Sequence, residues 1–592
     1  MGKETYAHIQ EQLNRADLSA MPGLSLSVLR NIMIEPIEPY LRYHAYLMGY
    51  NARVSFGEYD NIFQEAAGGD DRLLNRQTDC VLVFAYLDTL SPDLARGFSA
   101  LNPDQVAAEV NRVQDFAEAV IRGIRAQTKG LILWNGLETP GHPNLGIWDS
   151  QIDTGQTAVI HRLNDFIRDR LRLEANACFV DMNLALIRIG AGNFYDRRYW
   201  HIGRAPYTRE ALAEIADEDF KFIRPLKGKN KKCLVLDCDN TLWGGIIGED
   251  GLSGIVLGKT YPGSAYSEFQ REIVNLYHRG IIIALCSKNN EPDVWEVFRK
   301  HPDMILKEEH ISAARINWND KAANLRGLAS DLNIGLDSMV FLDDSEFEIN
   351  LVKKELPEVA AILMPKGKAV EYRQMLAACG LFDTLTISEE DKHRGAMYKA
   401  EASRKSLLTQ ATDMEGYYRS LEMVVVIRLA DEFSIPRIAQ QTQKTNQFNL
   451  TTRRYTEADI QGFVNHPDYD VIYLDLKDRF GGSGIVGTCI LKYEQDRAII
   501  DTFLLSCRVL GRGVEEAFLS RALKRAKGRG CRTTVGEYLP TAKNGQVAEF
   551  YPKHGFTEVN PGKSAGHRVF HFDLQMEPGS EPAYFKEIIS DL

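Results

Sequence analysis

Polar side chains suited to phosphoryl transfer follow three apolar runs in the middle of the sequence. Asp237 and Asp239, one residue apart, follow the run CLVL. Ser287 ends the run IIIALC, and Asp343 and Asp344 end the run SMVFL. The carboxyl ends of parallel strands share one edge of a sheet, and open α/β sheets bind ligands at that edge. We therefore expect these side chains to meet at one site.

The residue types fit a definite reaction. One carboxylate can attack phosphorus to form an acyl phosphate, while a second carboxylate acts as acid and base. The hydroxyl of Ser287 and the ammonium of Lys321, in the segment NWNDKAANL, can hold the phosphoryl oxygens. Paired carboxylates favour a hard divalent cation, usually Mg²⁺. The pattern predicts a Mg²⁺-dependent phosphotransfer enzyme.

Taken in order, the motifs DxDxT, strand-ending Ser, Lys and strand-ending Asp-Asp resemble the haloacid dehalogenase (HAD) phosphotransferase superfamily. The resemblance implies that Asp237 is the nucleophile and that Asp239 is the acid/base and a metal ligand through its carbonyl. Ser287 and Lys321 would hold phosphate, and the metal site would comprise Asp237, Asp239, Asp343 and Asp344, with Asp344 favoured as a direct ligand. Taken singly, each motif is also explained by chance or by helix capping.

The short spacings between these motifs bear on the substrate. About 50 residues separate Asp237 from Ser287, and about 34 separate Ser287 from Lys321. A turn, a helix and a strand use up these lengths, so we expect no cap domain. An open site suits a substrate that is carried by a protein.

A second set of residues lies near the end of the chain, where a glycine-rich turn falls between an expected strand and an expected helix. Glycines at such a junction let backbone N–H groups approach a pyrophosphate, which a helix N-terminus favours. The arrangement resembles the GNAT acyltransferase fold and implies a phosphopantetheine arm, from coenzyme A or a carrier protein, held by Arg508, Gly511, Arg512, Gly513, Asn544 and Tyr551. The basic helix that follows is interpreted as a solvated face rather than a dock for an acidic carrier; it bears Arg521, Lys524, Arg525, Lys527 and Arg529.

Four of the nine cysteines are candidates to bear an acyl group: Cys233, Cys238, Cys286 and Cys507. No CxxC pair is present, so we expect free thiols. Negative charge around Cys238 would raise its pKa, whereas a helix N-terminus could lower that of Cys507. A buried inert thiol is the simpler interpretation of each, and direct transfer to a carrier thiol needs no enzyme-bound thioester.

The elements that must position these residues indicate an α/β multidomain chain. Strand-like runs alternate with helices over residues 1–225, which predicts a parallel sheet. This first domain resembles an SGNH hydrolase in outline but lacks the Gly-Asp-Ser nucleophile, so we interpret it as scaffold or docking surface; candidates for an old site, more simply structural, are Asn31, Asn135, Asp196 and His201. Residues 226–384 are expected to form the capless HAD-like Rossmannoid domain. A charged helical bridge and a GNAT-like α+β domain are expected over 385–592.

Composition narrows the function classes. The chain has 592 residues, 81 acidic against 70 basic, for a net charge of −11, which argues against general nucleic-acid binding. No run approaches the ~20 apolar residues that span a bilayer, and the start lacks the apolar stretch of a signal peptide. We expect a cytoplasmic protein with no membrane partner.

Essentially the whole chain resembles the FkbH-like family of HAD subfamily IIIC. The segments that carry the resemblance are LDCDNTLWGGIIGEDG, SKNN, INWNDKAANL, FLDDSEFE, KTNQFNLTTRRY and SCRVLGRGVEE. The family implies a glyceryl transferase/phosphatase that dephosphorylates D-1,3-bisphosphoglycerate and loads the glyceryl group as a thioester on an acyl carrier protein for polyketide biosynthesis. The alternative is a HAD phosphatase of another acyl or sugar phosphate, fused to a coenzyme A-dependent GNAT acyltransferase.

Overall fold

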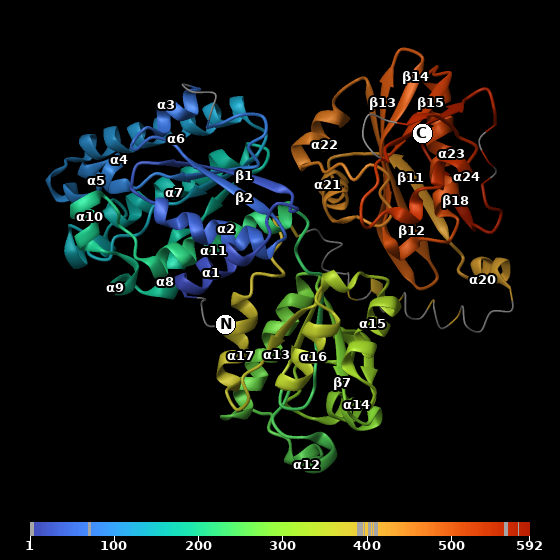
Figure 1. The fold of residues 1–592 in the computed structure, drawn as a ribbon, viewed down its shortest axis with the longest axis horizontal. Coiled ribbons are helices and arrows are strands. Elements are labelled where there is room, and N and C mark those ends of the chain that lie inside the picture. The colour runs from blue at the N-terminus through green and yellow to red at the C-terminus, as the bar shows by residue number, and fades with distance from the viewer. Residues whose placement is uncertain are drawn as a thin grey trace. The chain divides into compact units, whose positions relative to one another are not determined.

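The computed structural model forms two compact units, residues 1–229 and 230–592 (Figure 1). It describes residues 5–68, 73–387, 395, 397–398, 400, 404, 407, 413–561, 566–577, 579 and 581–592. Most of the predicted charged bridge falls outside these residues. Among the helices described, none combines the length and the apolar character needed to span a bilayer.

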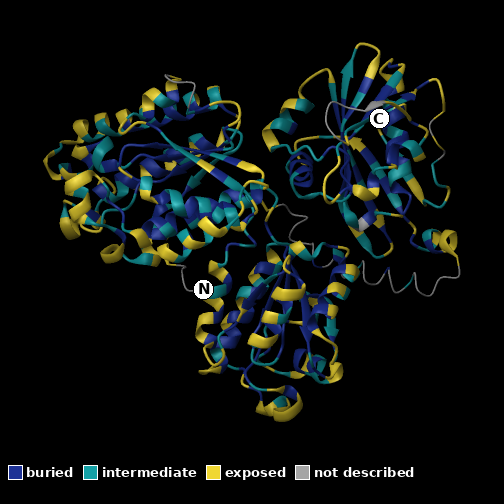
Figure 2. Ribbon diagram, viewed as in Figure 1, coloured by how far each residue is buried: buried dark blue, intermediate teal, exposed yellow. Residues whose placement is uncertain are grey.

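The first unit contains a five-stranded parallel sheet in the order β2-β1-β3-β4-β5. Its strands are β1 (Gly23–Arg30), β2 (Asn51–Phe56), β3 (Cys80–Phe84), β4 (Leu131–Asn135) and β5 (Ala177–Val180). The longer helices are α1 (Tyr6–Arg15), α2 (Glu38–Leu47), α3 (Ile62–Ala67), α6 (Pro103–Gln127), α7 (Gln156–Arg172), α8 (Met182–Ile189), α10 (Arg197–Gly203) and α11 (Arg209–Leu226), and the short ones are α4 (Leu87–Leu90), α5 (Pro92–Arg96) and α9 (Ala191–Phe194). Strands β3 and β4 are buried along their whole length, because apolar clusters cover both faces of the sheet. Figure 2 shows the burial of each residue along the ribbon.

The second unit begins with another five-stranded parallel sheet, in the order β10-β9-β6-β7-β8. The strands are β6 (Cys233–Leu236), β7 (Ile282–Ser287), β8 (Ile311–Ile316), β9 (Met339–Asp343) and β10 (Ala360–Leu363). The helices are α12 (Ile247–Gly254), α13 (Gly263–His278), α14 (Glu291–Lys300), α15 (Lys321–Leu332), α16 (Glu346–Glu355) and α17 (Ala369–Ala378). Within residues 230–387, all of which are described, no segment is long enough to form a cap domain over the sheet.

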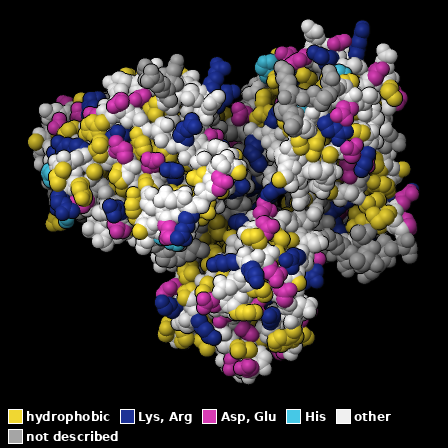
Figure 3. All heavy atoms as spheres, in the orientation of Figure 1, with side chains coloured by type: hydrophobic (Ala, Val, Ile, Leu, Met, Phe, Trp, Pro, Cys, Tyr) yellow, Lys and Arg dark blue, Asp and Glu magenta, His cyan; other side chains and the backbone are white. Residues whose placement is uncertain are grey.

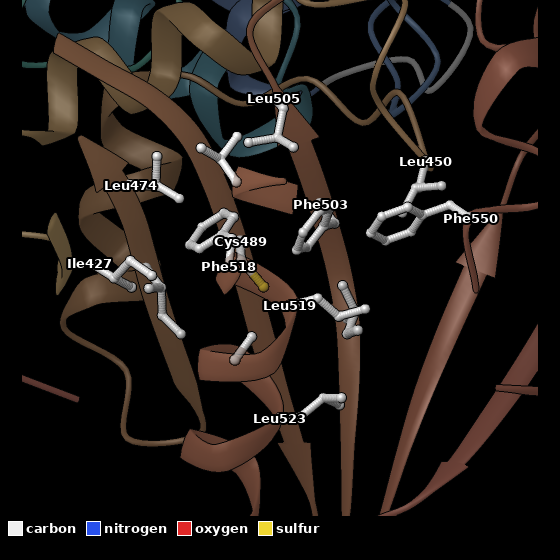
Figure 4. Packing of buried hydrophobic residues seen from close by; sticks show 14 of the residues in the cluster. Ile427, Leu450, Leu474, Cys489, Phe503, Leu505, Phe518, Leu519, Leu523 and Phe550 are labelled. Atoms are coloured by element: carbon white, nitrogen blue, oxygen red, sulfur yellow. The ribbon is translucent and has the colours of Figure 1, made fainter. Parts of the chain in front are cut away.

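The last sheet of the second unit has eight strands and mixes parallel and antiparallel pairs, in the order β16-β17-β15-β14-β13-β12-β11-β18. The strands are β11 (Val424–Leu429), β12 (Tyr469–Asp478), β13 (Gly481–Glu494), β14 (Arg497–Leu505), β15 (Thr533–Tyr538), β16 (Thr557–Pro561), β17 (Arg568–Asp573) and β18 (Glu587–Ser590). The helices are α20 (Met414–Ser420), α21 (Ile435–Lys444), α22 (Glu457–Val464), α23 (Val514–Gly528) and α24 (Phe550–Lys553). Apolar side chains from α23 and the strands form its core (Figure 4).

The predicted α/β multidomain fold class is confirmed, with two parallel sheets followed by a mixed one. On the visible face, acidic and basic side chains are interspersed (Figure 3).

Candidate active site

The candidate active site lies at the carboxyl edge of the second parallel sheet. Strand β6 lies between β7 and β9, so the residues that end these three strands are neighbours. The backbone N–H of Asp237 donates to the Leu342 carbonyl at 3.0 Å, which extends the β6–β9 ladder as far as the aspartate. Asp237, Ser287 and Asp343 are all buried. The structure thus brings the three predicted strand ends together.

Lys321, the first residue of α15, lies among the carboxylates. The side chain of Asp320 caps this helix by accepting from the Ala322 N–H at 2.7 Å, which fixes where the helix begins. The Lys321 ammonium donates to Asp237 Oδ1 at 2.7 Å and also to Asp343 Oδ2. Burial acts to lower the pKa of Lys321, but the charges of the two aspartates outweigh it and raise the pKa above its usual value.

The carboxylates of Asp237, Asp343 and Asp344 can each place one oxygen within 4.8 Å of the other two. Burial and the charge of Asp237 raise the pKa of Asp343 to about 7, and burial raises the pKa of Asp344. Three acidic oxygens in one small volume, offset by a single ammonium, fit a hard divalent cation such as Mg²⁺. The Asp239 carboxylate is not part of this group.

Asp239 has three hydrogen-bond donors of its own. Its Oδ1 accepts from Trp243 Nε1 at 2.9 Å and from the Ile247 N–H at 3.1 Å, and its Oδ2 accepts from Asn289 Nδ2 at 3.0 Å. Asn289 Nδ2 also lies 3.1 Å from the hydroxyl of Ser287, so one amide joins both side chains. Burial raises the pKa of Asp239, and the donors act against that rise because they stabilise its charged form.

Trp243 and Asn289 were assigned no role from the sequence. Asn289 lies two residues beyond a strand-ending serine, and Trp243 lies four residues beyond Asp239 in a turn. Both positions follow strands that end at the candidate active site. That placement is a signal that sequence reasoning could have used.

Three of the four candidate thiols are buried in this domain. Burial raises the pKa of Cys286 to about 12, and it also raises the pKa values of Cys233 and Cys238, in Cys238 with the help of the charge of Asp237. Cys507 is partly exposed and lies in the third sheet's domain. At neutral pH the buried three are thiols rather than nucleophilic thiolates.

The predicted pantetheine residues lie at the end of β14 and beyond it. Arg512 is buried, with its guanidinium 3.7 Å from the Asp478 carboxylate. Asn544 is fully buried and donates to the carbonyls of Asn449 and Leu539, both at 2.9 Å. Tyr551 is buried, and its hydroxyl has no hydrogen-bond partner among the described residues. The Arg508 side chain is not among those described.

The basic side chains of α23 are paired within their own domain. Arg521 and Lys524 bond Glu581, Arg525 bonds Asp470, and Lys527 bonds Glu577. Arg529, the residue after α23, donates to the carbonyl of Pro467. These contacts link the basic side chains to neighbouring residues of the same domain, which gives them a structural role on its surface.

In the first unit, the residues considered for an old site have structural contacts. The Asn31 side chain bonds the backbone N–H and carbonyl of Tyr86, and the Asp196 carboxylate caps α10. His201 is exposed on α10, whereas Asn135 is buried at the end of β4. The four residues are not hydrogen-bonded to one another.

No family model and no curated protein matches this chain. Among solved structures, it is similar to the N-terminal part of protein BF1531 from Bacteroides fragilis, described as containing a phosphatase domain complexed with Mg. That match has 28% identity and a TM-score of 0.57, and it covers 65% of this chain and all of the other.

Weaker matches include the ribosomal-protein-S18-alanine N-acetyltransferase from Escherichia coli, at 16% identity and a TM-score of 0.21, over 27% of this chain and 99% of the other. The GNAT domain of S. lividans PAT matches at 20% identity and a TM-score of 0.21, over 25% of this chain and 89% of the other.

Proposed function

We propose that this chain is a Mg²⁺-dependent phosphatase and glyceryl transferase. It takes D-1,3-bisphosphoglycerate, removes phosphate and loads the glyceryl group as a thioester on an acyl carrier protein. The observation that carries the phosphatase part is the buried cluster of Asp237, Lys321 and Asp343 at an uncapped sheet edge. The structural match described as a phosphatase domain complexed with Mg supports the same part.

The proposed phosphate removal assigns a step to each group. An Asp237 oxygen attacks the phosphorus of the C3 phosphate, and the bond from that phosphorus to the C3 oxygen of the glyceryl group breaks as Asp239 gives this oxygen a proton. Asp239 then takes a proton from water, whose oxygen attacks the aspartyl phosphate and frees inorganic phosphate and Asp237. Lys321 and Ser287 hold the phosphoryl oxygens in place. Mg²⁺, when bound by Asp237, Asp343 and Asp344, supplies positive charge that offsets the charge of the phosphate.

The acyl step needs no further enzyme group. The C1 phosphate of the substrate is an acyl phosphate, which is a good donor to a thiolate. The carrier's thiolate attacks C1, the C1–O bond to phosphate breaks, and phosphate leaves with the electron pair. The buried thiols Cys233, Cys238 and Cys286 are poor relays for this transfer because their pKa values are raised. Direct transfer to the carrier is therefore the simpler route.

A carrier-borne substrate is supported by the surface at the same edge. Trp318 follows β8 and is 71% exposed, and Phe347 follows β9 on α16 and is 70% exposed. Large apolar side chains exposed near an open site favour contact with a macromolecule.

The test is the intact mass of a holo carrier protein incubated with enzyme, 1,3-bisphosphoglycerate and Mg²⁺. We expect the carrier to gain a glyceryl group without phosphate. Asp237→Asn should leave it unloaded or bearing phosphoglyceryl, whereas the control Asp303→Asn, in a loop after α14, should match wild type. An unchanged carrier mass with wild-type enzyme would contradict the proposal, and acetyl-CoA turnover without carrier would favour the fused acyltransferase instead.

A further inference from the structure

An opening between β14 and β15 is filled by the chain itself. The two strands pair in parallel only from Arg497–Thr533 to Ile500–Gly536, although β14 continues to Leu505 and β15 to Tyr538. Beyond the paired part, β14 turns an unpaired edge toward the opening. Residues 448–453, from the loop that joins α21 to α22, lie along this edge, and we call them the strap.

The strap behaves as a short extra strand. The Leu450 N–H donates to the Phe503 carbonyl at 3.2 Å, and the Leu505 N–H donates to the Phe448 carbonyl at 3.0 Å. On the other side, the Leu539 N–H donates to the Leu450 carbonyl at 2.8 Å. The strap therefore uses the backbone groups of β14 and of the end of β15 that any other extended chain would need.

Side chains hold the strap in place. Phe448 and Leu450 are buried in the core cluster, and Leu450 lies on the same side of Phe503 as Phe550 (Figure 4). The Arg453 guanidinium pairs with Asp501 of β14 at 2.6 Å and with Glu537 of β15 at 2.7 Å. One side chain thus ties the strap to both strands.

The glycine-rich turn at the start of α23 is also occupied. The Gly511 N–H donates to the Glu515 carboxylate at 3.3 Å. Gly513 packs against Tyr584, whose hydroxyl occupies the place that a Cβ on this glycine would need and donates to the Arg512 carbonyl at 3.1 Å. Burial raises the pKa of Glu515 to about 7. A pyrophosphate at this turn would meet a carboxyl group and a tyrosine of the same chain.

We propose that the strap closes the β14–β15 opening to coenzyme A and to pantetheine arms. Pantetheine is an extended chain with two amides, so it would compete with the strap for the same backbone groups on β14. A ligand that must first displace a packed segment binds more weakly, by the fraction of molecules in which that segment is open. Acyl transfer from coenzyme A in this domain would then require the strap to leave. The carrier thiol would instead receive its acyl group at the candidate active site on the second parallel sheet.

The experiment measures coenzyme A binding to the full chain by calorimetry, with hydrogen exchange of residues 445–456 followed in parallel. Wild type should show no saturable binding up to millimolar coenzyme A, with slow exchange in the strap. The double variant Asn449→Ala/Arg453→Gln removes the bonds that the Asn449 side chain makes within the loop and both Arg453 ion pairs. Its strap should exchange faster than that of wild type, and it should bind coenzyme A at least tenfold more tightly than wild type does.

Arg428→Gln is the matched control, since it removes one ion pair, with Asp591, from β11 of the same sheet. It should behave as wild type, and phosphate release should be unchanged in all three proteins, which separates this test from that of the phosphatase. Micromolar coenzyme A binding by wild type with the strap still protected would overturn the proposal. A loosened strap that still admits no coenzyme A would also overturn it. If the double variant fails to fold, Arg453→Gln alone is held to the same two criteria.

Discussion

Replacing Lys321 by Met should destabilise the second parallel sheet strongly when no divalent cation is present. Lys321 is 4% exposed, and its ammonium neutralises two buried carboxylates. For the pair with Asp237 at 2.7 Å, Coulomb's law gives roughly 6 kcal/mol in an effective dielectric of about 20. Methionine also spares the cost of burying an ammonium, so the net loss expected for breaking a buried pair is about 3–5 kcal/mol.

The assay is hydrogen exchange of β6 and β9 peptides with increasing urea in EDTA, because local exchange reports the stability of this sheet even if the other domains unfold separately. Added Mg²⁺ should restore part of the loss, since the three neighbouring carboxylates would again have a cation. Lys300→Met is the matched control: its exposed pair with Glu296 on α14 should contribute less than about 1 kcal/mol. Equal effects of the two substitutions would refute the reasoning.

Other predictions concern proton binding and thiol reactivity. Trp243→Phe removes a hydrogen-bond donor from the Asp239 carboxylate and so raises the pKa of Asp239. The limb of the pH–rate profile of phosphate release that reports Asp239 should move upward by roughly one pH unit, and an unmoved profile would contradict this. Burial raises the pKa of Glu138 from 4.5 to about 7, so ionising it costs stability as pH rises through that range. Glu138→Gln should therefore stabilise the first unit against urea at pH 8 by roughly 1–3 kcal/mol and leave it unchanged at pH 4, and a gain equal at both pH values would argue against it. In native protein, iodoacetamide should alkylate Cys507 and spare Cys286, as mapped by peptide mass, and rapid labelling of Cys286 would be inconsistent with its burial.

The gathering of Asp237, Ser287 and Asp343 could be predicted because each ends a continuous apolar run, and such runs are typical of parallel strands buried on both faces. Strand β1 was not predicted, because its sequence, GLSLSVLR, alternates serine with apolar residues and so is not a continuous apolar run. Ser27 is nevertheless buried, and its hydroxyl donates to the Leu73 carbonyl. Strand β8 carries Arg315 and two alanines and offered no apolar run.

The sequence places Trp243 and Asn289 just beyond two strands of this edge, but it does not show that they donate to Asp239, because only the folded backbone brings these donors and the Ile247 N–H within 3.1 Å of its carboxylate. The position of the strap beside β14 could not be predicted for the same reason. The segment KTNQFNLTTRRY was noticed as a motif, but its contacts with Phe503 and Leu539 join residues about 50 and 90 positions apart. Such non-local pairing leaves no periodic signal in one sequence.

The central claim, that Asp237 forms a covalent phosphoenzyme, is tested most directly by trapping it. Enzyme turning over 1,3-bisphosphoglycerate with Mg²⁺ is quenched and treated with borohydride, which reduces an aspartyl phosphate to homoserine. The mass of the peptide that contains residue 237 is then measured. We expect homoserine at position 237 in wild type and in Asp303→Asn, and neither homoserine nor release of the C3 phosphate in Asp237→Asn. Release of the C3 phosphate by Asp237→Asn at the wild-type rate would contradict the account.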